Sequence, residues 1–169
     1  MHTLSPHHES PGALMQFAGR ISVFGGRDVS PQLYQDTITI GKRMAENNYL
    51  VFCGGGNGVM EAISRGVHEG EGTVIGIMKG METGESNPYV HIPVYTNMGI
   101  GRNPLLAYNC DVALAVGGKY GTLSEIAYAL QCDKPVIGFQ SWQIDGMISV
   151  NTIDDVFSEI SRYLNGHNT

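Results

Sequence analysis

Short apolar runs alternate along this chain with longer segments of helical periodicity. The apolar runs predict buried strands, and they span residues 20–24, 49–53, 73–77, 91–95, 111–116 and 134–139. Amphipathic segments predict helices over 31–47, 59–69 and 102–109, in the Ala/Leu-rich run that includes Glu125, and after the capping residue Thr152. A short edge strand is expected near Ile148.

This alternation of strands and helices favours a parallel sheet that is covered on both faces. We therefore expect an α/β, Rossmann-like doubly wound fold with a mainly parallel sheet of about six to seven strands. Residues 18–165 are expected to form a single ligand-binding domain, and the polar stretch 1–17 a flexible N-terminal tail. The tail carries His2, His7 and His8, which could bind a metal ion, although a tail that happens to contain histidine is the favoured interpretation.

Three of the predicted strands end in glycine-rich turns, at residues 25–26, 54–58 and 117–121. Glycine lets a backbone approach a ligand closely, and the first N–H groups of a following helix point at a bound anion. In doubly wound folds these turns meet at the carboxyl ends of the strands, where ligands bind. The turns therefore predict a site for a phosphorylated small molecule or a comparable oxyanion. The turn at 117–121 is followed by Thr122, which could cap the helix or donate its hydroxyl group.

The charged residues support an anionic ligand. The chain has 10 Lys and Arg against 16 Asp and Glu, for a net charge of -6. Four of the basic residues follow predicted strands, so they are expected at one edge of the sheet: Arg27, Lys79, Arg102 and Lys119. The acidic balance argues against nucleic acid as a partner.

The apolar runs and the cysteines predict a soluble protein in a reducing compartment. No apolar run approaches 18 residues, and no basic segment followed by an apolar core opens the chain. We therefore expect a cytoplasmic protein with no membrane partner. Cys53, Cys110 and Cys132 are expected to be free thiols. The turn-rich stretch 78–90 predicts a mobile loop, either an ordinary one or a lid over the ligand.

Three motifs, in order, carry a family resemblance: GGGNGVMEA at 54–62, MGIGRN at 98–103 and GGKYGTLSE at 117–125. Together they resemble the Lonely Guy superfamily of Rossmann-like proteins over roughly residues 20–140. Enzymes of that superfamily hydrolyse the N-glycosidic bond of nucleoside 5′-monophosphates, which releases the base and ribose 5-phosphate. The resemblance implies that Arg102 and Glu125 are the catalytic pair if this chain is a hydrolase.

Details of the motifs are more similar to a second group. Gly117 and Lys119 replace a Pro and a Gly of the enzymes' Pro-Gly-Gly-x-Gly-Thr-x-x-Glu motif, and Asn103 replaces the Lys that follows their arginine. The segments VGG-x-x-GTLSEIA-x-AL and GIGRN look more like molybdenum cofactor carrier proteins and their uncharacterised bacterial relatives. Those proteins bind a pterin-phosphate cofactor without known turnover and are oligomeric. The resemblance thus implies molybdenum cofactor or a similar ligand, and a homo-oligomer, either a dimer or a tetramer.

Neither NAD nor pyridoxal phosphate is expected as a cofactor. The turn after the first strand lacks the full GxGxxG fingerprint of dinucleotide binding. Some members of the superfamily have been labelled lysine decarboxylases, but nothing in this chain suggests pyridoxal phosphate chemistry. No metal site is predicted.

Three functions remain open at this point: a carrier, a hydrolase and a nucleotide sensor without chemistry. In a hydrolase, Glu125 would stabilise positive charge on the ribose or activate water. The purely structural alternative for Arg102 and Glu125 is an ion pair between two helix N-termini. The candidate ligand-binding residues all lie at predicted strand ends or helix starts, and they are Gly25, Gly26, Arg27, Gly54, Gly55, Gly56, Asn57, Gly58, Lys79, Arg102, Asn103, Gly117, Gly118, Lys119, Tyr120, Gly121, Thr122 and Glu125.

Overall fold

The computed structural model describes residues 16–166 of the chain. The flexible tail expected over 1–17, with its three histidines, lies outside the described residues except for its last two positions. Of these, Gln16 accepts a hydrogen bond at its carbonyl oxygen from Asn48 Nδ2, over 2.8 Å.

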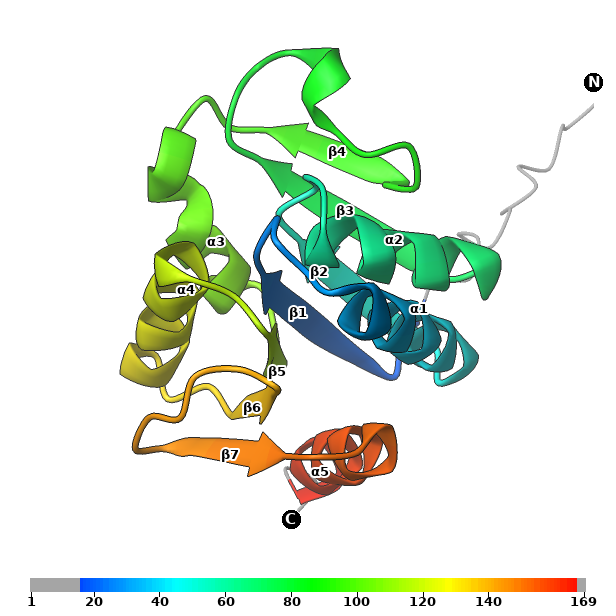
Figure 1. Cartoon of the computed structure of the whole chain (residues 1–169), viewed down its shortest axis with the longest axis vertical. Coiled ribbons are helices and arrows are strands. Elements are labelled where there is room, and N and C mark those ends of the chain that lie inside the picture. The colour runs from blue at the N-terminus through cyan, green and yellow to red at the C-terminus, as the bar shows by residue number, and fades with distance from the viewer. Residues whose placement is uncertain (1–15, 167–169) are drawn as a thin grey trace, which may run out of the picture.

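The core of the described chain is a seven-stranded sheet in the order β4-β3-β2-β1-β5-β6-β7 (Figure 1). Every neighbouring pair of strands is parallel. The direction of strand order reverses between β1 and β5, which confirms the doubly wound Rossmann-like prediction and puts the switch point at these two strands. The strands are β1 (Gly19–Gly25), β2 (Tyr49–Cys53), β3 (Thr73–Met78), β4 (Ile92–Tyr95), β5 (Val112–Val116), β6 (Val136–Phe139) and β7 (Met147–Val150).

Helices cover both faces of the sheet, as Figure 1 shows. One face carries α1 (Pro31–Glu46), α2 (Val59–Glu69) and α5 (Ile153–Gly166), whose apolar side chains form one core cluster with the sheet. The other face carries α3 (Asn103–Tyr108) and α4 (Tyr120–Gln131), which build a second cluster around Phe24. Two short 3-10 helices, η1 (Thr83–Glu85) and η2 (Gly99–Arg102), lie in the loops on either side of β4.

Four of the predicted elements differ from the structure at their boundaries, namely three strands and one helix. The expected strands at 91–95, 111–116 and 134–139 start later, because polar residues or Pro135 precede the paired segment. Asp111 lies just before β5, and its carboxylate accepts hydrogen bonds from the backbone N–H and the guanidinium of Arg20. The helix expected from Arg102 divides into η2 and α3, since Pro104 begins a new helical turn, where its missing N–H costs nothing.

Two further expectations concern membranes and thiols. No helix in the described part of the chain combines the length and apolar character that crossing a membrane requires. Cys53, Cys110 and Cys132 are free thiols, as expected.

The close approach of α1 and α2 depends on two glycines that face each other. A Cβ atom at Gly66 would lie 2.1 Å from the carbonyl oxygen of Ile38 and 2.9 Å from Cα of Gly41. A Cβ atom at Gly41 would lie 2.6 Å from the carbonyl oxygen of Ile63. Backbone atoms cannot give way as a flexible side chain can, so any larger residue must force the helices apart.

We therefore predict that Gly66→Ala lowers the free energy of unfolding by roughly 1–3 kcal/mol, the usual cost of overpacking. This loss would outweigh the gain of about 1 kcal/mol in helix propensity that alanine brings. Urea unfolding followed by circular dichroism measures the change. Gly166→Ala is the matched control, because a Cβ atom there meets nothing within 4 Å. Equal stability of the two variants would contradict the prediction.

Candidate functional site

Two adjoining cavities lie at the carboxyl ends of the central strands. The helix cavity, of about 240 Å³, is lined by Gly25, Gly26, Arg27, Asp28, Met60, Lys79, Arg102, Asn103, Lys119, Gly121, Thr122 and Glu125. The loop cavity, of about 560 Å³, is lined by Arg27, Gly54, Gly56, Met60, Met78, Lys79, Gly80, Glu85, Asn97, Gly99 and Arg102. They share Arg27, Met60, Lys79 and Arg102, so the two cavities form one trough with three cations at its centre.

The N-terminus of α4 opens into the helix cavity without a side-chain cap. Lys119 is the N-cap residue, and its carbonyl oxygen accepts the first helical hydrogen bond, from Leu123 N–H, over 2.9 Å. The N–H groups of the first turn therefore remain available to an anion, with the helix dipole behind them. Gly118 has φ of 97°, and a Cβ atom there would lie 2.2 Å from Thr122 Oγ1, so this turn requires glycine.

Lys119 and Thr122 lie where the sequence places them but act differently. Lys119 Nζ forms an ion pair with Asp28 Oδ2 over 2.5 Å, with both side chains mostly exposed. This contact lowers the pKa of Asp28 and raises that of Lys119. Lys119 therefore balances Asp28 in this structure instead of supplying an unpaired cation. Helix α4 has no side-chain cap, so Thr122 does not cap it; its buried side chain lies in the first turn and lines the helix cavity.

Arg102 is buried between the strand ends, with 3% of its surface exposed. Its Nη1 donates to the carbonyl oxygen of Ile77, and its Nε donates to Asn103 Oδ1 over 3.0 Å. The guanidinium lies against Gly54, where a Cβ atom would be 2.6 Å from both terminal nitrogens. The glycine after β2 is thus required by the arginine, and burial lowers the pKa of Arg102.

Asn103 positions Arg102 relative to α4. Besides accepting from Arg102, Asn103 donates from Nδ2 to Ser124 Oγ over 2.9 Å. Ser124 in turn donates to the carbonyl oxygen of Gly121 over 2.7 Å. The residue that departs from the enzyme motif therefore connects the buried arginine to the first turn of α4.

Glu125 is a buried carboxyl group that faces the helix cavity, with 6% of its surface exposed. None of the described residues forms a hydrogen bond or an ion pair with its carboxylate, so the plain ion pair with Arg102 is not formed. Burial raises the pKa of Glu125 to about 7, while the charges of Arg102 and Lys79 act in the opposite direction. At neutral pH the group can therefore give or take a proton.

Lys79 follows β3 and lines both cavities. Partial burial lowers its pKa, and the neighbouring charges of Arg102 and Arg27 add to the effect. The mutual repulsion of these cations favours an anion between them.

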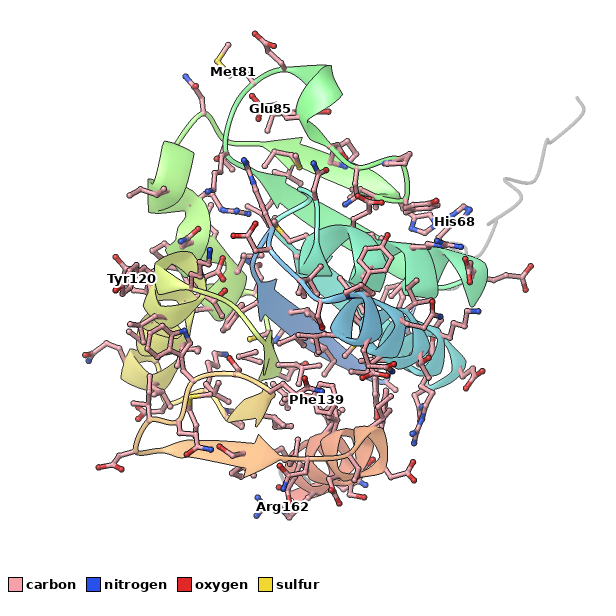
Figure 2. All side chains as sticks on the ribbon, viewed as in Figure 1. His68, Met81, Glu85, Tyr120, Phe139 and Arg162 are labelled. Atoms are coloured by element: carbon pink, nitrogen blue, oxygen red, sulfur yellow. The ribbon has the colours of Figure 1, made fainter. Side chains whose placement is uncertain are left out.

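The loop over 78–90 is held against the turn that follows β2. Asn87 is buried and donates from Nδ2 to the carbonyl oxygens of Gly55 and Gly56 over 3.1 and 3.0 Å. Glu85 Oε2 accepts from Gly80 N–H over 3.0 Å, and Figure 2 shows Glu85 in the loop beside β4. This loop thus forms one wall of the loop cavity.

Several predicted ligand residues line neither cavity. Tyr120 (labelled in Figure 2) is 81% exposed. Its ring lies beside that of Trp142, with centroids 6.2 Å apart. Asn57 is exposed as well. The remaining four are glycines that shape the turns: Gly55, Gly58, Gly117 and Gly118. Gly58 illustrates why these turns need glycine: a Cβ atom added there would lie 2.3 Å from the carbonyl oxygen of Arg27.

The trough is also lined by residues that were not predicted from the sequence, namely Asp28, Met60, Met78, Gly80, Glu85, Asn97 and Gly99. Met60 lies inside a quoted motif, and its burial on the inner side of α2 is the signal that could have identified it. Glu85 and Asn97 belong to irregular segments without a motif, so only the folded chain reveals their role.

Both groups that the motifs resemble are represented among the known proteins similar to this chain. A cytokinin riboside 5′-monophosphate phosphoribohydrolase of Arabidopsis thaliana is 33% identical over 132 residues, which is 70% of this chain and 60% of that protein. The chain thus spans less than two thirds of that relative.

Solved structures of molybdenum cofactor proteins match over nearly their whole length. The molybdenum cofactor binding protein of Rippkaea orientalis has a TM-score of 0.81 at 28% identity, covering 87% of this chain and 97% of that one. The molybdenum cofactor carrier protein of Chlamydomonas reinhardtii has a TM-score of 0.80 at 25% identity, covering 86% and 98%.

These matches confirm the superfamily that the three motifs predict. The model of the SLOG cluster4 family matches residues 19–163, which include every described strand and both cavities. The chain therefore belongs to the SLOG cluster4 family.

Proposed function

We propose that this protein binds a phosphorylated heterocyclic small molecule and that molybdenum cofactor, a pterin with a phosphate group, is the first candidate. The observation that carries the proposal is the trough with Arg27, Lys79 and Arg102 at its centre and the uncapped start of α4 at one end. A phosphate group in the helix cavity would meet both the cations and the free N–H groups. The loop cavity would hold the rest of the ligand.

The similarity to molybdenum cofactor proteins supports a carrier. Those matches cover 97% and 98% of the molybdenum cofactor proteins, whereas the match to the phosphoribohydrolase covers 60% of that enzyme. In a carrier no residue has to act as a base. Asn103, which replaces the lysine of the enzymes, serves here to position Arg102 and α4.

One observation favours a second candidate, the hydrolysis of a nucleoside 5′-monophosphate. Glu125 has no hydrogen-bond or ion-pair partner among the described residues, and its pKa is raised to about 7, which suits a general base near neutral pH. In that reaction the departing base takes the electrons of the N-glycosidic bond and positive charge develops on the ribose. The Glu125 carboxylate would stabilise this charge and take a proton from the attacking water. That proton then passes to the departing base, so the products are neutral base and ribose 5-phosphate.

A turnover assay separates the two candidates. Purified protein is incubated with AMP and with GMP, and chromatography measures free base and ribose 5-phosphate. For a carrier we expect no release, together with thermal stabilisation by molybdenum cofactor. Release by the wild type that is lost in Glu125→Gln would replace the carrier with the hydrolase. Stabilisation by a nucleotide alone, without product, would favour a sensor.

The raised pKa of Glu125 also predicts how stability depends on pH. The folded protein holds the proton up to about pH 7, while the unfolded chain releases it near the ordinary value of 4.5. Stability is therefore lost as the pH rises through this window. We predict that Glu125→Gln, which removes the buried charge, stabilises the ligand-free protein at pH 8 by about 3 kcal/mol but not at pH 4.

Denaturant titrations at both pH values measure this difference, with Glu46→Gln on the exposed surface of α1 as the control. A stabilising ion pair between Arg102 and Glu125 would give the opposite sign, because removing one partner of a buried pair destabilises the protein. Destabilisation at pH 8 would therefore contradict our assignment.

The surface of α3 and α4 supports a homo-oligomer. Across both helices the only acidic or basic side chain is Glu125, which is buried. Tyr108 is 53% exposed and Tyr128 is 42% exposed. By contrast, α1, α2 and α5 all carry charged residues that form ion pairs. An uncharged aromatic face can meet its own copy across a two-fold axis without like-charge repulsion, so we propose that it is the subunit interface.

We predict that Tyr128→Lys dissociates the oligomer, because the two-fold axis would bring the new charges together at a desolvated face. Light scattering coupled to size-exclusion chromatography measures the mass. Gln35→Lys, on the exposed surface of α1, is the control and should leave the mass unchanged. A monomeric wild type, or a Tyr128→Lys variant with unchanged mass, would contradict this interface.

A further inference from the structure

The polar groups of the trough are arranged by charge along its length. Arg27, Lys79 and Arg102 line both cavities and form its centre. Beyond them, the lining of the loop cavity includes the acidic residue Glu85 and the polar residue Asn97. A small inorganic anion would be held by the cations but repelled by Glu85. The arrangement instead suits a ligand that is anionic in one part and rich in hydrogen-bond donors in another.

The remaining walls of the loop cavity suit a flat ring. Met60 and Met78 contribute thioether groups, which make favourable contacts with aromatic rings. Gly54 and Gly56 line the same space, so the wall formed by the turn after β2 is bare backbone. At about 560 Å³ the cavity falls in the size range of small-molecule sites and is far larger than a phosphate group needs.

Glu85 is held in a defined position at this cavity. Its Oε2 accepts from Gly80 N–H, and a Cβ atom at Gly80 would lie 2.0 Å from Oε1, so the carboxylate packs directly on the glycine backbone. An ionised carboxylate has two oxygens with about four acceptor positions and no donor. One bond to Gly80 leaves the other positions for a ligand.

We propose that the loop cavity recognises the donor edge of a 2-amino-4-oxopyrimidine ring, the edge that guanine and pterins share, and that Glu85 reads it. This inference rests on the proposed function and specifies its ligand class. The edge presents a ring N–H beside an exocyclic NH₂ group, and a carboxylate accepts from both. Adenine presents an unprotonated ring nitrogen at the equivalent position, where its lone pair would face the carboxylate.

The inference predicts a rank order of ligands that differ by single groups. GMP should bind about tenfold to hundredfold more tightly than IMP, which lacks the 2-amino group, and than AMP, which has the reversed edge. For the pterin source of the same edge, pterin should bind more tightly than lumazine, which carries oxygen in place of the amino group. Isothermal titration calorimetry with the full chain measures each affinity.

Glu85→Gln tests the residue directly. The amide keeps an oxygen that can accept from Gly80 N–H, so the loop should hold its shape, but the amide nitrogen now faces the donor edge. We expect the preference for GMP over IMP, and for pterin over lumazine, to disappear. Glu82→Gln, an exposed neighbour outside both cavities, should keep both preferences.

The outcomes separate this inference from the proposed function. Either preference, present in the wild type and lost in Glu85→Gln, supports recognition by Glu85. Equal binding of GMP, IMP and AMP together with equal binding of pterin and lumazine would overturn the inference while the phosphate site stands. If neither these compounds nor molybdenum cofactor binds the folded protein, both the inference and the proposed function fail.

Discussion

The burial of one guanidinium group sets the geometry of the trough. Arg102 lies between the ends of β2 and β3. Its guanidinium donates hydrogen bonds there to the carbonyl oxygen of Ile77 and to the side-chain oxygen of Asn103. Burying a charge is costly unless its hydrogen bonds are satisfied, so these partners fix where α3 begins. Through Ser124, Asn103 extends the same constraint to the start of α4. The anion site and the buried carboxyl group are thus held by one connected network.

The cations Arg27, Lys79 and Arg102 and the protonatable carboxyl group of Glu125 line the same cavity. An anionic ligand would offset the repulsion among Arg27, Lys79 and Arg102, but its charge would also disfavour the ionised form of Glu125. Ligand binding and proton uptake are therefore coupled, because each event changes the charge that the other experiences. The same coupling applies to a carrier and to a hydrolase.

The alternation of short apolar runs and amphipathic segments is enough to predict the parallel fold. Strands buried on both faces are apolar throughout, whereas helices that cover the sheet are apolar on one side only. The glycine turns and the motifs also place Arg102 and Glu125 correctly at the strand ends. The pairing of Lys119 with Asp28 is not predictable, since the partners are 91 residues apart and meet only when β1 and β5 lie together. Glu85 and Asn97 escape prediction for a different reason: their loops have no periodicity, and the contact of each residue with Gly80 belongs to no motif.

The contact between Gly54 and Arg102 also bears on how this chain can vary. Any side chain at residue 54 would occupy the space of the guanidinium, whose nitrogens lie 2.6 Å from where its Cβ atom would be. A shorter residue at 102 would remove the contact with the guanidinium and leave a void. Alanine at 54 could fill that void once the flexible side chain of Met60, whose Sδ lies 2.7 Å from the same point, had shifted. Residues 54 and 102 are therefore expected to covary among related sequences, so that a substitution at 54 is accompanied by a compensating substitution at 102.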